Sequence, residues 1–187
     1  MAKSENLILK EASGSIGGIL TITKSKSGAT RLGKHRGASR VLATSKQLEV
    51  QAKFKQSIIY AKAVMDDPDL KALYATAIKG DQSAYNLAMR DAFKAPEITK
   101  INTELYDGLV GSTITLRAVD DFKVASVRLV IYSANGDVVE QGDAVLQANG
   151  LDWLYTATVA NGVVAGSKVR AVAKDLPANE TMMDVVL

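Results

Sequence analysis

Two periods of hydrophobic spacing divide the chain near Pro96. Between residues 44 and 95, apolar side chains recur every three or four positions, which predicts amphipathic helices. From Glu97 onward they alternate with polar side chains at every second position, which predicts half-buried strands. The pattern therefore indicates an α+β chain.

The helical stretch divides into three predicted helices. Thr44 and Gln47 have the spacing of a capping box and predict the start of the first helix. Its expected apolar face comprises Leu48, Ala52, Phe54, Ile58, Ala61 and Met65. Asp67 followed by Pro68 predicts the second start, because Asp caps helices and Pro favours the first helical position. Gly80 is expected to end that helix, and a third runs from about Asp81 until Pro96 stops it.

The alternating stretch predicts an antiparallel β-sandwich. Alternation is clearest in residues 113–118, 127–132, 153–159 and 168–174. Asn-Gly pairs at 135–136, 149–150 and 161–162 lie between strand segments, and Asn-Gly favours the type I′ turns of tight hairpins. Six or seven short strands at this spacing fit a sandwich over residues 97–187.

The N-terminal segment, residues 1–43, has no aromatic residue and many Gly and Ser residues. Such a segment buries little surface alone, so its order must come from a neighbour or a partner. Residues 16–23 have strand character, and a hairpin turn is expected at Ser27-Gly28. The resulting division is a basic Gly-rich arm (1–43), a small helical region (44–96) and a sandwich (97–187).

Charge follows the same division. The formal net charge is only +3, but residues 1–60 carry a net +8, residues 61–95 zero and residues 96–187 a net −5. The arm between residues 24 and 40 has six cations and no acid: Lys24, Lys26, Arg31, Lys34, Arg36 and Arg40. These side chains are expected to bind a polyanion or an acidic protein surface, the alternative being a solvated, flexible charge run. Nucleic acid is a possible partner, contacted through its backbone, since no aromatics interleave the cations to stack on bases.

Composition argues against most enzymes. There is no Cys and one His, which removes thiol nucleophiles, disulfides and His- or Cys-based metal sites, so neither a cofactor nor a metal is expected. His35 lies between two cations and is expected at the surface. Residues 14–18 lack the pattern of a phosphate-binding loop and predict a bend or bulge. No apolar run suits a membrane span or a secretory signal, so we expect a protein made in the cytoplasm with no membrane partner.

Two groups in the sandwich segment are weaker candidates for binding. An oxygen cluster for Ca²⁺ could form from Asp120, Asp121, Asp152, Asp175, Asn179 and Glu180, although acidic loop residues are usually solvated and no spacing matches a known loop. Trp153 and Tyr155 could offer an exposed aromatic surface, although an alternating strand more often places such rings in the core.

Residues 127–136, 139–144, 153–158 and 168–180 resemble the strands of bacterial immunoglobulin-like domains. The last stretch is similar to their closing V-x-A-x-D-x-x-G-N strand pair, with Ala178 where Gly is usual. No Cys…Trp…Cys framework is present, so the antibody type is excluded. The resemblance implies an Ig-like sandwich and says little about function.

The first half resembles short uncharacterised proteins of Bacteroidota genomes, their phages and mobile elements. Residues 14–18, 21–28 and 84–89 carry this resemblance. It implies a structural or accessory role in a particle. We therefore expect a non-enzymatic assembly protein, such as a phage virion component, that forms a homo-oligomer and contacts other subunits. The alternative is a cytoplasmic accessory protein that binds nucleic acid without sequence specificity.

Overall fold

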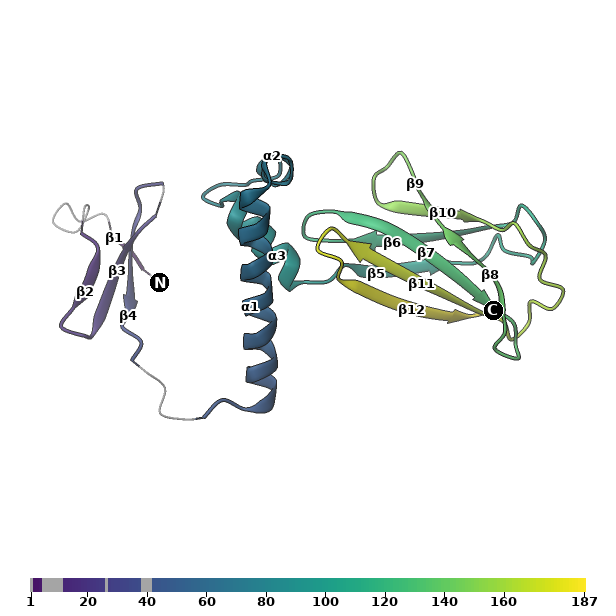
Figure 1. Ribbon diagram of the computed structural model, residues 1–187, viewed down its shortest axis with the longest axis horizontal. Coiled ribbons are helices and arrows are strands. Elements are labelled where there is room, and N and C mark those ends of the chain that lie inside the picture. The colour runs from purple at the N-terminus through teal and green to yellow at the C-terminus, as the bar shows by residue number, and fades with distance from the viewer. Residues whose placement is uncertain (1, 5–11, 26, 38–41) are drawn as a thin grey trace. The chain divides into compact units, whose positions relative to one another are not determined.

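The computed structural model describes residues 2–4, 12–25, 27–37 and 42–187 (Figure 1). Within these residues the protein is α+β, with three helices and three antiparallel four-stranded sheets. The chain separates into two compact units. The N-terminal unit comprises residues 1–51 and 78–83, and the C-terminal unit comprises residues 52–77 and 84–187.

The N-terminal sheet has the strand order β1-β4-β3-β2. Its strands are β1 (Ala2–Ser4), β2 (Gly14–Ile16), β3 (Leu20–Lys24) and β4 (Thr30–Lys34). The single strand predicted over residues 16–23 is wrong, because a hairpin turn at Gly17-Gly18 divides it. Both glycines have positive φ, 58° and 64°, as a type I′ turn requires.

The hairpin predicted at Ser27-Gly28 is confirmed. β3 pairs with β4 in antiparallel register, and the turn is closed by hydrogen bonds from Ser25 N to Ala29 O and from Gly28 N to Ser25 O. The hydroxyls of Ser25 and Ser27 donate to Asp81 Oδ2, which ties the turn to the 78–83 segment of the same unit.

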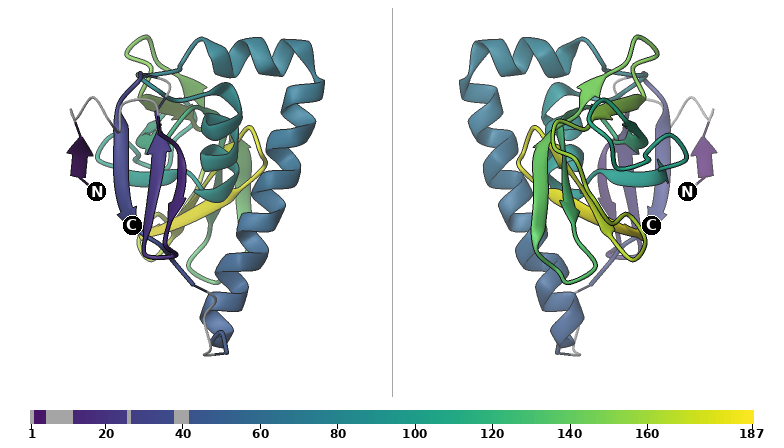
Figure 2. Two further views of the ribbon diagram at one scale, coloured as in Figure 1. Left: turned by 90° about the vertical axis from the view of Figure 1, so that its left-hand side faces the viewer. Right: turned by 90° about the vertical axis from the view of Figure 1, so that its right-hand side faces the viewer.

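Three helices follow the N-terminal sheet: α1 (Ser45–Asp66), α2 (Pro68–Ala75) and α3 (Ala84–Phe93). Both predicted caps are confirmed. Thr44 N donates to Gln47 Oε1 and Gln47 N donates to Thr44 Oγ1, which is the reciprocal capping box. Asp67 Oδ1 accepts from the amides of residues 69 and 70, and the chain changes direction sharply there between α1 and α2 (Figure 2). The third helix begins at Ala84, later than predicted.

The sandwich consists of two sheets with orders β5-β6-β10-β9 and β12-β11-β7-β8. Their strands are β5 (Glu97–Asn102), β6 (Thr113–Val119), β7 (Val124–Tyr132), β8 (Val138–Asp143), β9 (Val145–Leu146), β10 (Asp152–Thr156), β11 (Lys168–Asp175) and β12 (Glu180–Val186). β11 follows the predicted alternation throughout, with every second side chain buried. Inward residues of both sheets, such as Leu116 and Leu129, share one core, so the β-sandwich is confirmed.

The helices cover one end of the sandwich. Their core centres on Val64, Tyr74 and Leu87, and it includes Phe122 and Leu176 from loops of the sandwich. The Tyr74 and Phe122 rings stack with their centroids 4.4 Å apart. The opposite end, called the distal end below, consists of the loops 103–112 and 133–137 together with the segment 157–167 (Figure 1).

The Asn-Gly turns differ from expectation in two respects. The pairs at 135–136 and 149–150 do connect adjacent antiparallel strands, but only their glycines have positive φ, so neither is a type I′ turn. The pair at 161–162 joins no hairpin, and Asn161 is buried with its amide donating to Ser167 Oγ. Among the described non-glycine residues, only Ala178 has positive φ, at 72° in the β11–β12 turn.

Within the described part of the chain, none of the helices combines the length and apolar character needed to cross a bilayer.

Candidate functional site

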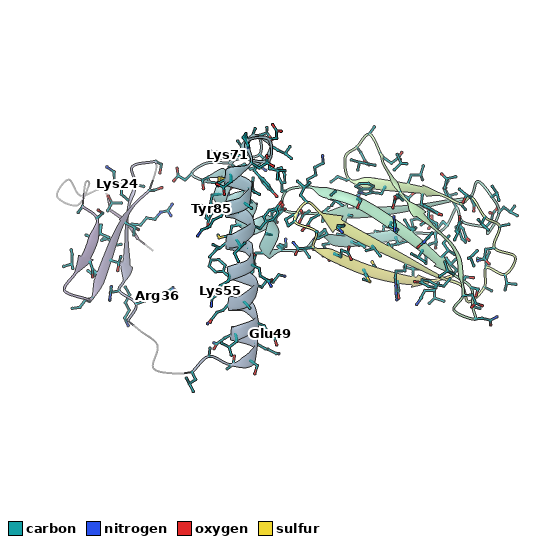
Figure 3. All side chains as sticks on the ribbon, viewed as in Figure 1. Lys24, Arg36, Glu49, Lys55, Lys71 and Tyr85 are labelled. Carbon is teal, nitrogen blue, oxygen red and sulfur yellow. The ribbon has the colours of Figure 1, made fainter. Side chains whose placement is uncertain are left out.

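The predicted cations lie along the β3–β4 hairpin and just after it. Lys24 ends β3, Arg31 and Lys34 lie on β4, and Arg36 follows; all four are exposed. Lys24 and Arg36 lie at opposite ends of the hairpin (Figure 3). The other two predicted cations, Lys26 and Arg40, fall outside the described residues. The hairpin thus spreads positive charge along its whole length.

The register of the hairpin separates its two faces. Thr23 pairs with Arg31 and Thr21 with Gly33, so these positions share one polar face. The exposed His35 continues this face, with Nδ1 lying 3.4 Å from Thr21 Oγ1. An open depression with a volume near 630 Å³ is lined by Thr21, Thr23, Gly33, Lys34, His35 and Arg36. The depression is polar and edged by cations.

The N-terminal unit buries very little apolar surface. Ile22 is its one buried large hydrophobic side chain among the described residues. Seven others in this unit are exposed: Ile16, Ile19, Leu20, Leu42, Leu48, Val50 and Ile78. The C-terminal unit, by contrast, has a continuous core through both sandwich sheets. A small sheet needs an apolar face packed against another element for independent stability, and here most of that surface is open.

Three acids are exposed at the distal end of the sandwich. Glu104 and Asp107 lie in the β5–β6 loop, and Asp137 lies in the β7–β8 turn. Other acids of the sandwich are paired within it, including Asp143 with Arg128 and Asp184 with Arg170. Glu97 at the start of β5 is exposed as well, so exposed acids lie at both ends of the sandwich, three of them at the distal end.

The aromatic candidates lie in the sandwich core. Trp153 is 7% exposed and Tyr155 is 4% exposed, so neither offers a ring face to solvent. Their strand, β10, turns both inward because they are two residues apart.

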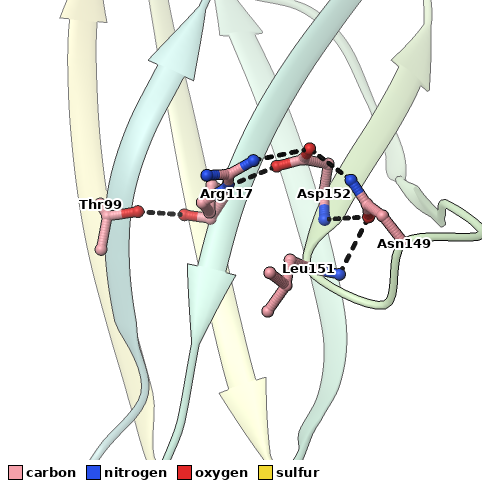
Figure 4. Close-up of polar contacts among 5 residues, drawn as sticks. All are labelled: Thr99, Arg117, Asn149, Leu151 and Asp152. Carbon is pink, nitrogen blue, oxygen red and sulfur yellow. Dashed lines mark hydrogen bonds and ion pairs between the residues drawn. The ribbon is translucent and has the colours of Figure 1, made fainter.

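The predicted acidic oxygens do not form one cluster. Asp152 forms a two-pronged ion pair with Arg117, with N–O distances of 2.7 and 2.9 Å, and accepts a further bond from Asn149 (Figure 4). Asp121 pairs with Arg90 and Lys94, and Glu180 pairs with Lys174.

The remaining two, Asp120 and Asp175, meet a third carboxylate that sequence reasoning missed. Asp91 on α3 reaches the end of the sandwich, and one carboxylate oxygen from each of the three lies within 4.8 Å of the others. Asp91 is 0% exposed and Asp175 is 2% exposed. Asn179 donates its backbone amide and its side-chain amide to Asp175, and the side-chain amide also reaches the carbonyl of Asp91. We call Asp91, Asp120 and Asp175 the carboxylate cluster.

Burial dominates the electrostatics of this cluster. The pKa of Asp91 is raised from an ordinary 3.8 to about 8, mainly by burial and also by the neighbouring carboxyl groups of Asp120 and Asp175, against a hydrogen bond from Tyr74 that lowers it. Burial also raises the pKa of Asp175, while the bonds from Asn179 lower it. Burial and mutual repulsion therefore disfavour three simultaneous negative charges in this cluster.

Comparisons with known proteins leave the function open. No family model and no curated protein matches this chain. Among solved structures, CopC from Methylosinus trichosporium OB3b aligns with 48% of this chain and 87% of its own, at 16% identity and a TM-score of 0.35. An engineered protein aligns with 55% of this chain and 24% of its own, at 16% identity and a TM-score of 0.31. At TM-scores this low, neither alignment carries information about activity.

Proposed function

We propose that this chain is a non-enzymatic structural protein that assembles head to tail with further copies of itself. The N-terminal unit of one copy binds the distal end of the sandwich of the next. The particle that these copies build is a phage virion or a phage-like assembly, in which the sandwich serves as an Ig-like module for subunit contacts.

The observation that carries the proposal is the open apolar surface of the N-terminal unit. A folded segment must bury enough apolar area to offset the conformational entropy that it loses. With Ile22 alone buried and Ile16, Ile19 and Leu20 exposed, this unit is under-packed by itself. A partner that covers these side chains supplies the missing burial, and clustered exposed hydrophobics commonly mark such interfaces.

Charge favours another copy of this chain as that partner. Lys34 pairs with the exposed Leu20, and Arg31 and Arg36 are exposed on the same hairpin, while the distal end presents Glu104 and Asp107. The distal end also exposes Leu105, Leu109 and Val110 beside these acids, so it offers matching apolar surface. Because the two surfaces differ, the contact is heterologous and builds rings or filaments.

Light scattering during size-exclusion chromatography tests the proposal on the full chain. The protein is expected to elute above the monomer mass, with the mass rising with concentration. Ile19→Ser should shift the distribution towards monomer, whereas Met182→Ser, a matched change of an exposed side chain on β12, should leave it unchanged. A monomer at all concentrations would overturn the proposal.

A second candidate, backbone binding of nucleic acid, is favoured by the depression beside Lys34, His35 and Arg36. Its cation-rich lining, without Phe, Tyr or Trp, suits phosphate contacts without base reading. A gel shift with duplex DNA and with single-stranded RNA at two salt concentrations tests it. Affinity that falls steeply with salt supports this candidate, and no shift at low salt excludes it.

A further inference from the structure

The carboxylate cluster joins three elements that are far apart in the sequence. Asp91 comes from α3, Asp120 follows β6, and Asp175 ends β11. Each lies where the helices meet the end of the sandwich. Whatever neutralises the cluster therefore acts on the attachment between the helices and the sandwich.

Several of the cluster's oxygens face no donor from another part of the described chain, apart from a proton shared between Asp91 and Asp120 themselves. These are Asp91 Oδ1 and both carboxylate oxygens of Asp120, and all three atoms are inaccessible to solvent. Asp91 as a whole is fully buried. Buried carboxylate oxygens are normally paired, because desolvation without compensation is costly. The cations nearest along α3 do not supply this pairing, since Arg90 and Lys94 both contact Asp121 instead.

We propose that the carboxylate cluster is a Ca²⁺ site that fastens the helices to the sandwich. Calcium takes oxygen ligands at about 2.3–2.6 Å, so two ligands on one ion lie at most about 5 Å apart. The mutual limit of 4.8 Å in the cluster satisfies this condition. Three carboxylates are hard anionic ligands, which suit Ca²⁺ and Mg²⁺ rather than softer metals.

Burial favours Ca²⁺ over Mg²⁺. Magnesium usually retains several waters and demands near-octahedral geometry, whereas calcium accepts irregular coordination. Two of the three carboxylates here are buried, which leaves little room for a hydrated ion. Asp120 also helps to line an open pocket of about 340 Å³ with Phe122 and Trp153, so the cluster lies next to a solvent-filled hollow.

Titration calorimetry of the full chain, treated with EDTA and dialysed, tests the site with CaCl₂ and separately with MgCl₂ at pH 7. The expected result is one Ca²⁺ per chain. The unfolding midpoint should rise by about 5–10 °C once free Ca²⁺ exceeds its Kd a hundredfold. Asp120→Asn should abolish binding, and Asp91→Asn should weaken it at least tenfold.

Asp121→Asn is the matched control, because Asp121 adjoins Asp120 in sequence but pairs with Arg90 and Lys94; this variant should bind Ca²⁺ as the parent does. Asp91→Asn is expected to fold, since Asn has the same shape as Asp and can still accept the hydrogen bond from Tyr74; circular dichroism checks this. No heat and no midpoint shift at millimolar Ca²⁺ would overturn the proposal. Equal binding by Asp120→Asn would overturn the location, and a response to Mg²⁺ alone would overturn the choice of ion.

Discussion

Tyr74 on α2 donates a hydrogen bond from its hydroxyl to Asp91 Oδ2 on α3, with an O–O distance of 2.5 Å. The Tyr74 hydroxyl also lies 3.0 Å from the hydroxyl of Tyr60 on α1. A chain of three polar side chains therefore links all three helices inside their own apolar core, and it ends at the carboxylate cluster.

Replacing Tyr74 with Phe should lower the free energy of unfolding by about 1–3 kcal/mol, because a buried carboxylate oxygen loses its donor. Tyr60→Phe is the matched control, since it removes one hydroxyl and leaves the Tyr74–Asp91 bond in place. Its cost should be about 1 kcal/mol or less. Urea denaturation measures the free energy of unfolding of both variants. Equal losses would show that the hydrogen bond to Asp91 contributes no more than the one between the two tyrosines.

The stability of the metal-free chain should fall as the pH rises from about 4 to about 8. The folded state holds a proton on Asp91 up to a pKa of about 8, whereas the unfolded state releases it near 3.8. The stabilisation is thus complete below pH 3.8 and is lost as the pH rises through the folded pKa. Tyr74, Tyr60, Asp120 and Asp175 are the titratable groups facing Asp91, and all are acids that cannot supply a compensating positive charge.

Urea midpoints at about pH 5 and about pH 8, both in EDTA, measure this slope. Asp91→Asn should flatten it, because the variant has no proton to lose at this position. Parallel pH profiles for the parent and Asp91→Asn would contradict the assignment of the raised pKa to Asp91.

Glu140 accepts hydrogen bonds from the segment that follows β10. Its side chain is 7% exposed, and Oε2 accepts bonds from the amides of Thr158 and Val159 at 2.9 and 3.2 Å and from the Thr158 hydroxyl. Glu140→Ala should speed hydrogen exchange at these two amides and cost about 2 kcal/mol. Gln141→Ala, at the exposed neighbouring position, should change neither. Unaltered exchange at both amides in Glu140→Ala would show that they are protected by something else.

Ala178→Gly should stabilise the chain by a few tenths to about 1 kcal/mol. Ala178 has a φ of 72°, a region that costs a residue with a Cβ about 1–2 kcal/mol, partly offset by the greater entropy of unfolded Gly. Ala165→Gly is the control, because that exposed alanine does not have positive φ and should only lose stability. Thermal unfolding compares the two, and equal losses would contradict the argument.

Local features of this fold are readable from sequence. The Thr44–Gln47 cap, the Asp67 cap and the alternation of β11 depend on neighbours a few residues away, and all three were predicted. The break at Gly17-Gly18 was missed because a tight hairpin leaves the apolar pattern of residues 16–23 continuous. The Asn-Gly pairs at two sites do connect adjacent strands, as predicted. The predicted turn type was wrong, because only the glycine of each pair has positive φ.

The carboxylate cluster could not be predicted from the sequence. Asp120 and Asp175 were among the acids considered, but Asp91 looks like an ordinary polar position on a helix. Only the packing of α3 against the end of the sandwich brings it to the other two. Three other acids were predicted to join them but form ion pairs with Lys94, Arg117 and Lys174 instead: Asp121, Asp152 and Glu180. The periodicity of the sequence does not reveal these pairs.

Head-to-tail assembly is tested most directly by two complementary charge-reversed chains. One carries Arg31→Glu, Lys34→Glu and Arg36→Glu in the N-terminal sheet; the other carries Glu104→Lys, Asp107→Lys and Asp137→Lys at the distal end. Each alone should remain monomeric in light scattering, because its two ends repel. An equimolar mixture should regain the assembled mass and lose it at high salt. A mixture that stays monomeric while the parent assembles, or single variants that assemble as the parent does, would contradict the account.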